Sequence, residues 1–153
     1  RLVTNERFYE MAKFQSVDEL VEATRPVNPV YCIREDSIET SAAWFKNNFP
    51  GNILYAVKAN PNEKVLKTLL KNNITDFDTA TIEEIRLIKK IAPQAKAYFM
   101  HTIKSKESIS EAYFKYNVKD FSLDSKDELD KILKATNQAK DLTLYLRIQA
   151  SNE

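Results

Sequence analysis

The sequence contains a single glycine, Gly51, among its 153 residues. Glycine-rich phosphate loops need several glycines in a short stretch, because the backbone must turn tightly and approach the phosphate closely. Neither a P-loop nor a G-x-G-x-x-G turn is therefore present within these residues. Cysteine is equally scarce. Cys32 is alone, so an internal disulfide is impossible, and this fits a reducing compartment.

Charge of one sign and long apolar runs are also missing. A net charge of +1 gives no electrostatic reason to expect nucleic acid or an anionic membrane as a partner. No apolar run approaches the roughly 20 residues of a membrane span, and the first residues lack the apolar stretch of a secretory signal. With 43% apolar and 29% charged residues, the sequence predicts a soluble globular protein of the cytoplasm. No metal site is expected.

What the sequence does have is a repeated pattern, a short apolar strand followed by an amphipathic helix. The expected strands are residues 53–58, 76–79, 95–100, 120–123 and 142–148. The expected helices are one that is capped by Asp36 or Ser37 and runs to about residue 48, and then residues 62–72, 82–91, 106–116 and 126–136. Strands start about every 20 to 24 residues, the length of one βα unit with short loops. This alternation predicts a parallel sheet with right-handed crossovers.

A sheet of this kind belongs either to an open doubly wound fold or to a barrel. The strands are short and each is followed by one helix, which favours a (β/α)8 TIM barrel. A complete barrel needs about 250 residues, whereas this chain begins at Arg1 and stops soon after a fifth strand. We therefore expect an α/β fold, with about five βα units forming the first half of a barrel over residues 36–153. The chain would then be the N-terminal piece of a longer polypeptide.

Residues 1–35 are expected to form a separate N-terminal segment. Ser16 and Glu19 make a capping box that starts a short helix ending near Thr24. The two prolines of residues 25–29 then force extended backbone, and residues 29–34 have the composition of a strand. Cys32 is expected to be a small buried side chain in that strand.

Lys58 directly follows the apolar run of residues 53–57 and comes just before Asn60-Pro61, which breaks the strand. A strand this apolar is typical of a parallel sheet covered on both faces. Its carboxyl end is where barrels and open sheets place their sites. Partial desolvation there would lower the pKa of Lys58 and favour the neutral amine that an imine requires. The alternative is an ordinary surface lysine at a strand end.

Other polar residues fall at the ends of the later strands. They are Asp78, His101, Asp124 and Arg147. Because the carboxyl ends of barrel strands converge on one mouth, we predict that these groups and the lysine share it. Asp78 and Arg147 have opposite charges and could order one another as a bidentate pair.

Helix capping is the alternative role for two of these residues. Asp78 and Asp124 each precede an expected helix and could accept hydrogen bonds from its first N–H groups. Thr81 and Ser125 lie closer to the same helix starts and are rival caps. The sequence alone leaves both roles open.

Five segments of the chain resemble the fold-type III pyridoxal-phosphate decarboxylases. They are YAVKANP (55–61), DFDTATIEE (76–84), YFMHTIK (98–104), DFSLDS (120–125) and LYLR (144–147). They occur in the family's order, cover about residues 28 to 150, and are most similar to the bacterial ornithine/lysine decarboxylase branch. The resemblance implies an alanine racemase-like TIM barrel followed by a β-domain, to which residues 29–34 would contribute a strand.

The resemblance also implies roles for individual residues. It makes Lys58 the Schiff-base lysine for pyridoxal 5'-phosphate, and it places Asp78 and Arg147 in the cofactor pocket. Supporting positions around that pocket are Glu84, His101 and Asp124. Glu84 could equally favour the macrodipole of the helix that begins at residue 82. The family's cofactor-stacking histidine belongs to a later strand, so His101 is expected to be a half-exposed loop residue.

The activity that the resemblance implies for the whole protein is decarboxylation of a basic amino acid. Ornithine to putrescine, a step of polyamine biosynthesis, is the first expectation, and lysine or another basic amino acid is the alternative. The cofactor acts as an electron sink. The family's active site forms between the two subunits of a homodimer, and its phosphate loop lies beyond residue 153, so this piece is expected to be inactive alone. A non-catalytic regulatory homologue and a small cofactor-carrier barrel are the alternatives from other classes.

Overall fold

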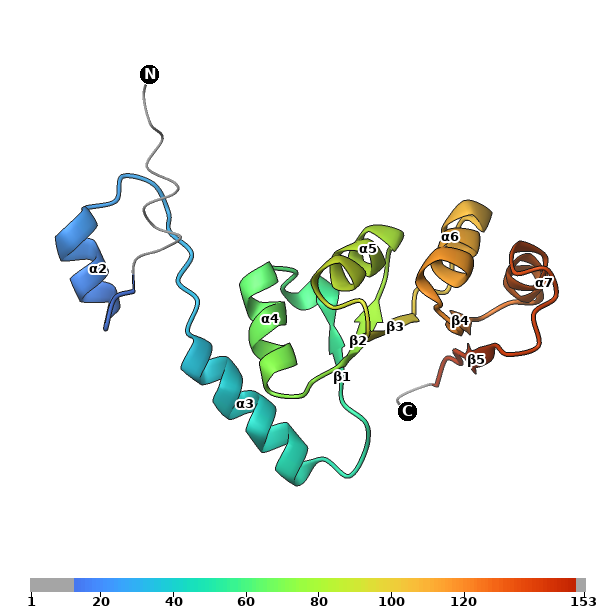
Figure 1. The fold of residues 1–153 in the computed structure, drawn as a ribbon, viewed down its shortest axis with the longest axis horizontal. Helices are drawn as coiled ribbons and strands as arrows, with labels where there is room; N and C mark the ends of the chain where they lie inside the picture. Colours follow the sequence, from blue (N-terminus) through green and yellow to red (C-terminus); the bar gives the residue numbers. More distant parts are fainter. Residues whose placement is uncertain (1–12, 151–153) are drawn as a thin grey trace, which may run out of the picture. The chain divides into compact units, whose positions relative to one another are not determined.

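The computed structural model describes residues 13–150 and divides the chain into two compact units, Arg1–Arg34 and Glu35–Glu153. The elements of both units are drawn in Figure 1. None of the helices between residues 13 and 150 has the length and apolarity of a membrane span.

The first unit contains helix α2 (Val17–Thr24), which begins as its capping box predicts. Ser16 Oγ accepts a hydrogen bond from the N–H of Glu19 at 3.1 Å. The Glu19 carboxylate reaches back to the N–H of Gln15 at 2.5 Å, one residue earlier than in the usual capping box. Arg25 ends the helix in the left-handed region, with φ of 42°.

The strand predicted at residues 29–34 is wrong for this chain. These residues have no regular secondary structure, and Cys32, expected to be buried, is exposed. A strand exists only where a neighbouring strand takes up its N–H and C=O groups. All the strands of residues 13–150 lie in one sheet formed by residues after 53, so this segment has no such neighbour.

The second unit alternates helices and strands as the sequence pattern predicts. Its helices are α3 (Glu35–Asn48), α4 (Glu63–Lys71), α5 (Ile82–Ile91), α6 (Lys106–Tyr116) and α7 (Lys126–Ala135). Its strands are β1 (Leu54–Ala56), β2 (Asp76–Thr79), β3 (Lys96–Phe99), β4 (Asp120–Leu123) and β5 (Thr143–Leu146). A short 3-10 helix, η1 (Val57–Ala59), follows β1. Most expected boundaries are confirmed to within one or two residues.

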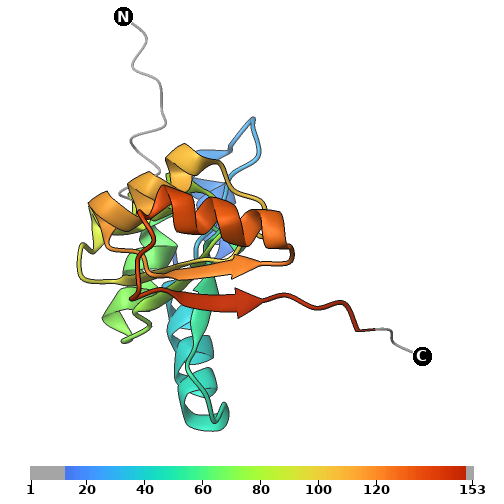
Figure 2. The ribbon, with the colours of Figure 1, turned by 90° about the vertical axis from the view of Figure 1, so that its right-hand side faces the viewer.

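The strand order decides between the two sheet folds that the sequence left open. Neighbours in the sheet follow the chain order β1-β2-β3-β4-β5, and every pair is parallel. A doubly wound sheet reverses its order at a switch point and carries helices on both faces, whereas a barrel wall adds each new strand beside the last. Figures 1 and 2 show α4 to α7 on one face of the sheet. The unit is therefore part of a TIM-barrel wall.

Side chains alternate between the two faces of this wall. Phe77, Phe99 and Phe121 point from β2, β3 and β4 into the layer beneath the helices and are buried. The helices supply fully buried isoleucines: Ile85, Ile88, Ile109 and Ile132. Burying each such side chain stabilises the fold by roughly 1.5–3 kcal/mol. Successive side chains of a strand point to opposite faces, so the residues directly before and after each phenylalanine face the open side of the sheet. This is the interior side of a barrel.

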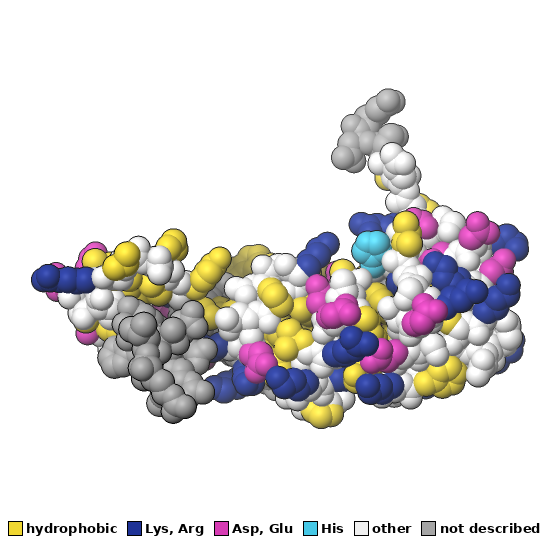
Figure 3. Space-filling view, turned by 90° about the horizontal axis from the view of Figure 1, so that it is seen from above, with side chains coloured by type: hydrophobic (Ala, Val, Ile, Leu, Met, Phe, Trp, Pro, Cys, Tyr) yellow, Lys and Arg dark blue, Asp and Glu magenta, His cyan; other side chains and the backbone are white. Residues whose placement is uncertain are grey.

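The outer surface of the helices carries charges of both signs. Figure 3 shows acidic and basic side chains interspersed over the part of the molecule that contains α4 to α7. Glu63 pairs with Lys67 and Lys90, and Arg86 pairs with Glu111 on the next helix. Exposed pairs of this kind contribute little to stability. Their effect is to give this face a mixed charge.

Candidate functional site

Lys58 lies in η1, immediately after β1. Val57 beside it is fully buried, while Asn60 forms a tight turn by accepting the N–H of Asn62 at 3.1 Å. The backbone of Lys58 is therefore fixed on both sides. Its amine bonds to no group among residues 13–150 and is exposed. The burial expected for this side chain is not found, because β1 is an edge strand with β2 as its one neighbour in the described sheet.

Asp78 lies on β2, opposite Ala56 of β1 in the register of the sheet. It is half-buried and faces the open side, since Phe77 and Thr79 on either side of it are fully buried. The cap of the following helix is Thr81, whose hydroxyl accepts the N–H of Glu84 at 3.2 Å. The carboxylate of Asp78 has no partner within the described part of the chain. Helix capping is thus excluded as its role.

This difference between the two residues gives a test of stability. Replacing Thr81 with alanine should lower the free energy of unfolding by about 1 kcal/mol, because α5 loses its N-cap. Replacing Asp78 with asparagine should change it by less than about 0.5 kcal/mol, since the carboxylate stabilises no described group. Urea denaturation of the two variants beside the parent protein measures both values. Equal losses would give Asp78 a structural role.

Glu84 has a structural task next to Asp78. Its carboxylate accepts the N–H of Ala80 at 2.7 Å, one residue before the N-cap Thr81, as the Glu19 carboxylate does in α2. The loop that leaves β2 is thereby closed onto the first turn of α5. Glu84 supports the position of Asp78 through this loop.

Asp124 and Arg147 follow β4 and β5. Ser125 caps α7, so Asp124, like Asp78, is not a helix cap, and its side chain is exposed. The N–H of Arg147 donates to the carbonyl of Leu123 at 2.8 Å, which extends the parallel ladder by one residue beyond β5. The guanidinium has no partner among residues 13–150. The expected pair with Asp78 is not formed, because β3 and β4 lie between their two strands.

His101 is an exposed loop residue, as predicted. Its Nδ1 accepts the N–H of Ile103 at 3.1 Å and also lies 2.8 Å from the Ile103 carbonyl. The ring therefore stabilises its own loop after β3. It does not contact any of the other predicted site residues.

The sequence interpretation missed a buried ion pair at the same end of the sheet. The side chain of Lys104 is fully buried, and its Nζ lies 2.9 Å from Glu128 Oε1. The same amine donates to the carbonyls of Ser122 and His101 at 2.6 and 2.8 Å. Burial lowers the pKa of Lys104, an effect that Glu128 opposes. Lysine is almost never fully buried unless it is paired.

This ion pair joins the ends of two strands. The β3–β4 ladder ends at Phe99 and Phe121, so the carbonyl of Ser122 needs another donor, which Lys104 supplies. Lys131 adds to the cluster by donating to the Lys104 carbonyl at 2.7 Å and to Glu128 Oε2 at 2.5 Å. The only sequence signal was the spacing of Glu128 and Lys131, three residues apart on α7. Nothing in the sequence linked them to Lys104.

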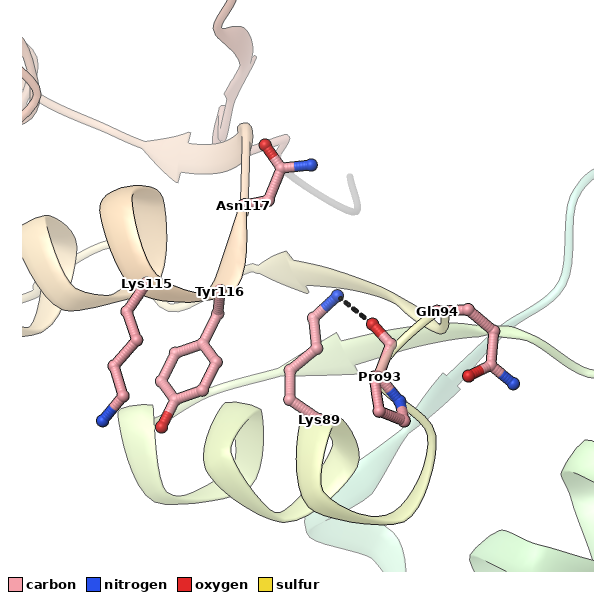
Figure 4. Close-up of a pocket in the computed structure, with 6 residues that line it drawn as sticks. All are labelled: Lys89, Pro93, Gln94, Lys115, Tyr116 and Asn117. Atoms are coloured by element: carbon pink, nitrogen blue, oxygen red, sulfur yellow. Dashed lines mark hydrogen bonds between the residues drawn. The ribbon is translucent and has the colours of Figure 1, made fainter.

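A hollow of about 490 Å³ lies at the opposite, amino end of the strands. Figure 4 shows its lining, which comes from the last turns of α5 and α6 and from the loops that follow them: Lys89, Pro93, Gln94, Lys115, Tyr116 and Asn117. The Lys89 amine is already engaged by the carbonyls of Pro93 at 3.3 Å and Ala95 at 2.6 Å. Burial lowers the pKa of Lys89. This hollow is not connected with the residues at the carboxyl end.

The fold is that of a TIM-barrel wall, and at the carboxyl ends of its parallel strands lie an amine, two carboxylates and a guanidinium that form no hydrogen bond or ion pair with residues 13–150. TIM-barrel proteins carry their sites at this end. Residues 35–153 match the family described as "Pyridoxal-dependent decarboxylase, pyridoxal binding domain". The match covers more than half of the chain. The chain therefore belongs to the pyridoxal-dependent decarboxylase family.

Individual relatives agree with this assignment. A lysine/ornithine decarboxylase of Selenomonas ruminantium is 27% identical over 115 residues, which is 74% of this chain and 29% of that protein. The arginine decarboxylase of Paramecium bursaria Chlorella virus, solved with agmatine, is 29% identical with a TM-score of 0.77, over 86% of this chain and 35% of that chain. The lysine/ornithine decarboxylase of Vibrio vulnificus, solved with cadaverine, is 30% identical with a TM-score of 0.76, over 90% of this chain and 38% of that chain. The chain thus spans about a third of the length of these relatives.

The side chains fit one end of pyridoxal phosphate. Its aldehyde needs an amine free of other partners, which Lys58 provides, and its ring carries polar atoms that Asp78 and Arg147 could contact. Ser122 Oγ adds a buried hydroxyl with no hydrogen-bond partner among the described residues, on the strand face opposite Phe121. The phosphate end has no glycine-rich cradle within residues 13–150. The described residues therefore fit the aldehyde end of the cofactor.

Proposed function

We propose that the whole protein is a pyridoxal phosphate-dependent decarboxylase of a basic amino acid and that Lys58 binds the cofactor. The observation that carries this proposal is the free, exposed amine of Lys58, held on a fixed turn at the carboxyl end of β1. The match of residues 35–153 to the family's pyridoxal-binding domain supports it. A regulatory homologue would not need a lysine without an ion-pair partner among residues 13–150 at this position.

The chain's own residues have distinct tasks in this proposal. Bound pyridoxal phosphate supplies an electron sink for breaking the bond to the carboxylate. Lys58 holds the cofactor through its amine and later competes with the amine of the substrate. Asp78 brings a negative charge from the neighbouring strand and favours protonated nitrogen close to it. Arg147 brings a fixed positive charge from the far side of the sheet and can orient an anionic oxygen.

Ornithine is the substrate that we propose within this class, with putrescine as product. The relatives named for lysine and ornithine support a diamine-forming enzyme, and a further structure of the Vibrio enzyme holds putrescine. Because another relative is an arginine decarboxylase, arginine, with its longer guanidinium side chain, is the alternative substrate. Chain length of the substrate is the property that separates these choices.

The substrate proposal is tested with the full-length protein loaded with pyridoxal phosphate. Release of CO2 from ornithine, lysine and arginine gives kcat/KM for each. We expect ornithine to exceed lysine by about 10-fold or more, because one methylene in a fitted pocket is worth roughly 1–3 kcal/mol. A larger kcat/KM for lysine or arginine would reassign the substrate, and turnover of none of the three would favour a non-catalytic homologue or a cofactor carrier.

The assembly is part of the same proposal. We infer a cytoplasmic homodimer with active sites shared between subunits, as the family resemblance implies. Light scattering of the full-length protein gives its mass, and mixing two different inactive variants tests sharing. Regained activity on mixing would support shared sites, and a monomeric mass would contradict them.

A further inference from the structure

A second polar cluster lies on the open face of the sheet, across β3, β4 and β5. Asp120 is only 3% exposed, yet it carries a carboxylate. The hydroxyl of Tyr145 donates to its Oδ1 at 2.9 Å, and Lys96 Nζ lies 3.1 Å from its Oδ2. Lys96 also lies 4.2 Å from the centre of the Tyr98 ring. Both oxygens of a buried carboxylate are thus satisfied by neighbouring strands, which is the condition under which such a group is tolerated.

The cluster includes a residue of β5, an edge strand of the described sheet. β5 pairs with β4 alone among the described strands, and its apolar side chains are exposed, Leu146 to 66%. The bond from Tyr145 to Asp120 is the one side-chain hydrogen bond that β5 makes within residues 13–150. Backbone ladders repeat every two residues, so they leave register weakly specified where no face is buried. The phenol of Tyr145 fixes the register that the ladder leaves open.

Arg147 lies two residues after Tyr145 and therefore on the same face. Its own side chain has no described partner, and its backbone is held by a single ladder bond to Leu123. A shift of β5 would carry Arg147 along the strand direction, at roughly 3.3 Å per residue. Burial, and after it the bond to Asp120, raise the pKa of Tyr145, so the phenol stays a donor at neutral pH.

We propose that Tyr145, Asp120 and Lys96 form an inner-face anchor that positions Arg147 for the cofactor. Tyr145 and Asp120 are positioning residues, because neither needs to touch the cofactor to act. The inference rests on the proposed function in one respect, the assignment of Arg147 to the cofactor pocket. The anchor explains what positions the Arg147 guanidinium, which makes no polar contact of its own with residues 13–150.

The test measures cofactor affinity in the full-length protein by titrating apoprotein with pyridoxal phosphate and following its absorbance. Tyr145→Phe keeps the ring and removes the donor. It should weaken cofactor binding about 10-fold, the effect of losing one hydrogen bond to a charged group. Tyr113→Phe is the matched control, because the Tyr113 phenol also donates to an aspartate, Asp141, at 2.8 Å. Tyr113 lies on helix α6 and not on the inner face of the sheet. The control should bind the cofactor as the parent protein does.

A double variant separates positioning from general damage to the fold. In a protein that already carries Arg147→Ala, Tyr145→Phe should weaken binding by less than about 2-fold further, since coupled residues are not additive. Full additivity would show that Tyr145 acts on stability alone and would overturn the proposal. If Tyr145→Phe does not fold, Lys96→Met provides the same comparison with an expected loss of about 3-fold, because Lys96 is half-exposed.

The outcomes also distinguish this inference from the proposed function. Weak binding in Arg147→Ala with unchanged binding in Tyr145→Phe would overturn the anchor and leave the function in place. Unchanged binding in Arg147→Ala would remove Arg147 from the cofactor pocket and overturn both the assignment and the anchor. The expected result is weak binding in both single variants, with less than about a 2-fold further loss in the double variant.

Discussion

Replacing Lys58 with alanine in the full-length protein should abolish decarboxylation, lowering kcat by about 10⁴-fold or more, as loss of a covalent catalytic group does in other enzymes. No other described amine lies on the turn after β1, so no neighbour can substitute for it. The fold should be unaffected. Lys58 is exposed and makes no bond to residues 13–150, so the free energy of unfolding should change by less than about 0.5 kcal/mol.

Two controls sharpen this experiment. Lys58→Arg keeps the positive charge but cannot supply a neutral amine, so it should be as inactive as the alanine variant. Lys67→Ala removes another exposed lysine, one that pairs with Glu63 on α4, and should keep nearly full activity. Substantial turnover by Lys58→Ala would mean that a different residue binds the cofactor. Turnover by Lys58→Arg alone would give Lys58 an electrostatic role.

Replacing Lys104 with methionine should produce the largest loss of stability, about 3–5 kcal/mol, because it leaves a buried carboxylate without one of its partners. Glu128 is 3% exposed, and the carbonyls of Ser122 and His101 lose their donor in the same step. The two strand ends that Lys104 joins should loosen together. Urea denaturation of the full-length protein measures the loss.

Lys126→Met is the matched control for this variant. Lys126 forms an exposed pair with Asp130 one turn further along α7, and its removal should cost less than about 0.5 kcal/mol. The double variant Lys104→Met, Glu128→Met should be more stable than Lys104→Met alone, because it also removes the buried carboxylate, which in the single variant keeps only Lys131 as a partner. If Lys104→Met is no more harmful than the control, the buried pair does not stabilise this end of the sheet.

Local chemistry explains how much of the fold the sequence predicted. Helices α5 and α6 and strands β2 and β4 lie where the pattern placed them, because their apolar periodicity and their caps are properties of adjacent residues. Thr81 and Ser125 were identified as rival caps for the same reason, and both are the actual caps. The prediction of a strand at residues 29–34 was wrong because a strand needs a neighbouring strand to pair with, and the local sequence does not show whether one is present.

For the site, too, the sequence predicted the features that depend on adjacent residues and missed those that depend on distant ones. The sequence correctly placed Asp78 at the carboxyl end of a strand and His101 in a loop, since strand ends can be read from the pattern. The burial of Lys58 and its pairing environment depend on which strands surround β1, and this is a tertiary property. Lys104 and Glu128 are 24 residues apart in the chain, and Tyr145 and Asp120 are 25 apart. Contacts at such separations arise from the parallel βα repeat and leave no local signal.

The central claim is that Lys58 is the residue that binds pyridoxal phosphate. Treating the full-length, cofactor-loaded protein with sodium borohydride fixes the cofactor to the amine that holds it, and peptide mass spectrometry then locates the added mass. We expect the pyridoxyl group on Lys58, in the peptide that contains residues 55–61. A pyridoxyl group on any other lysine would contradict it.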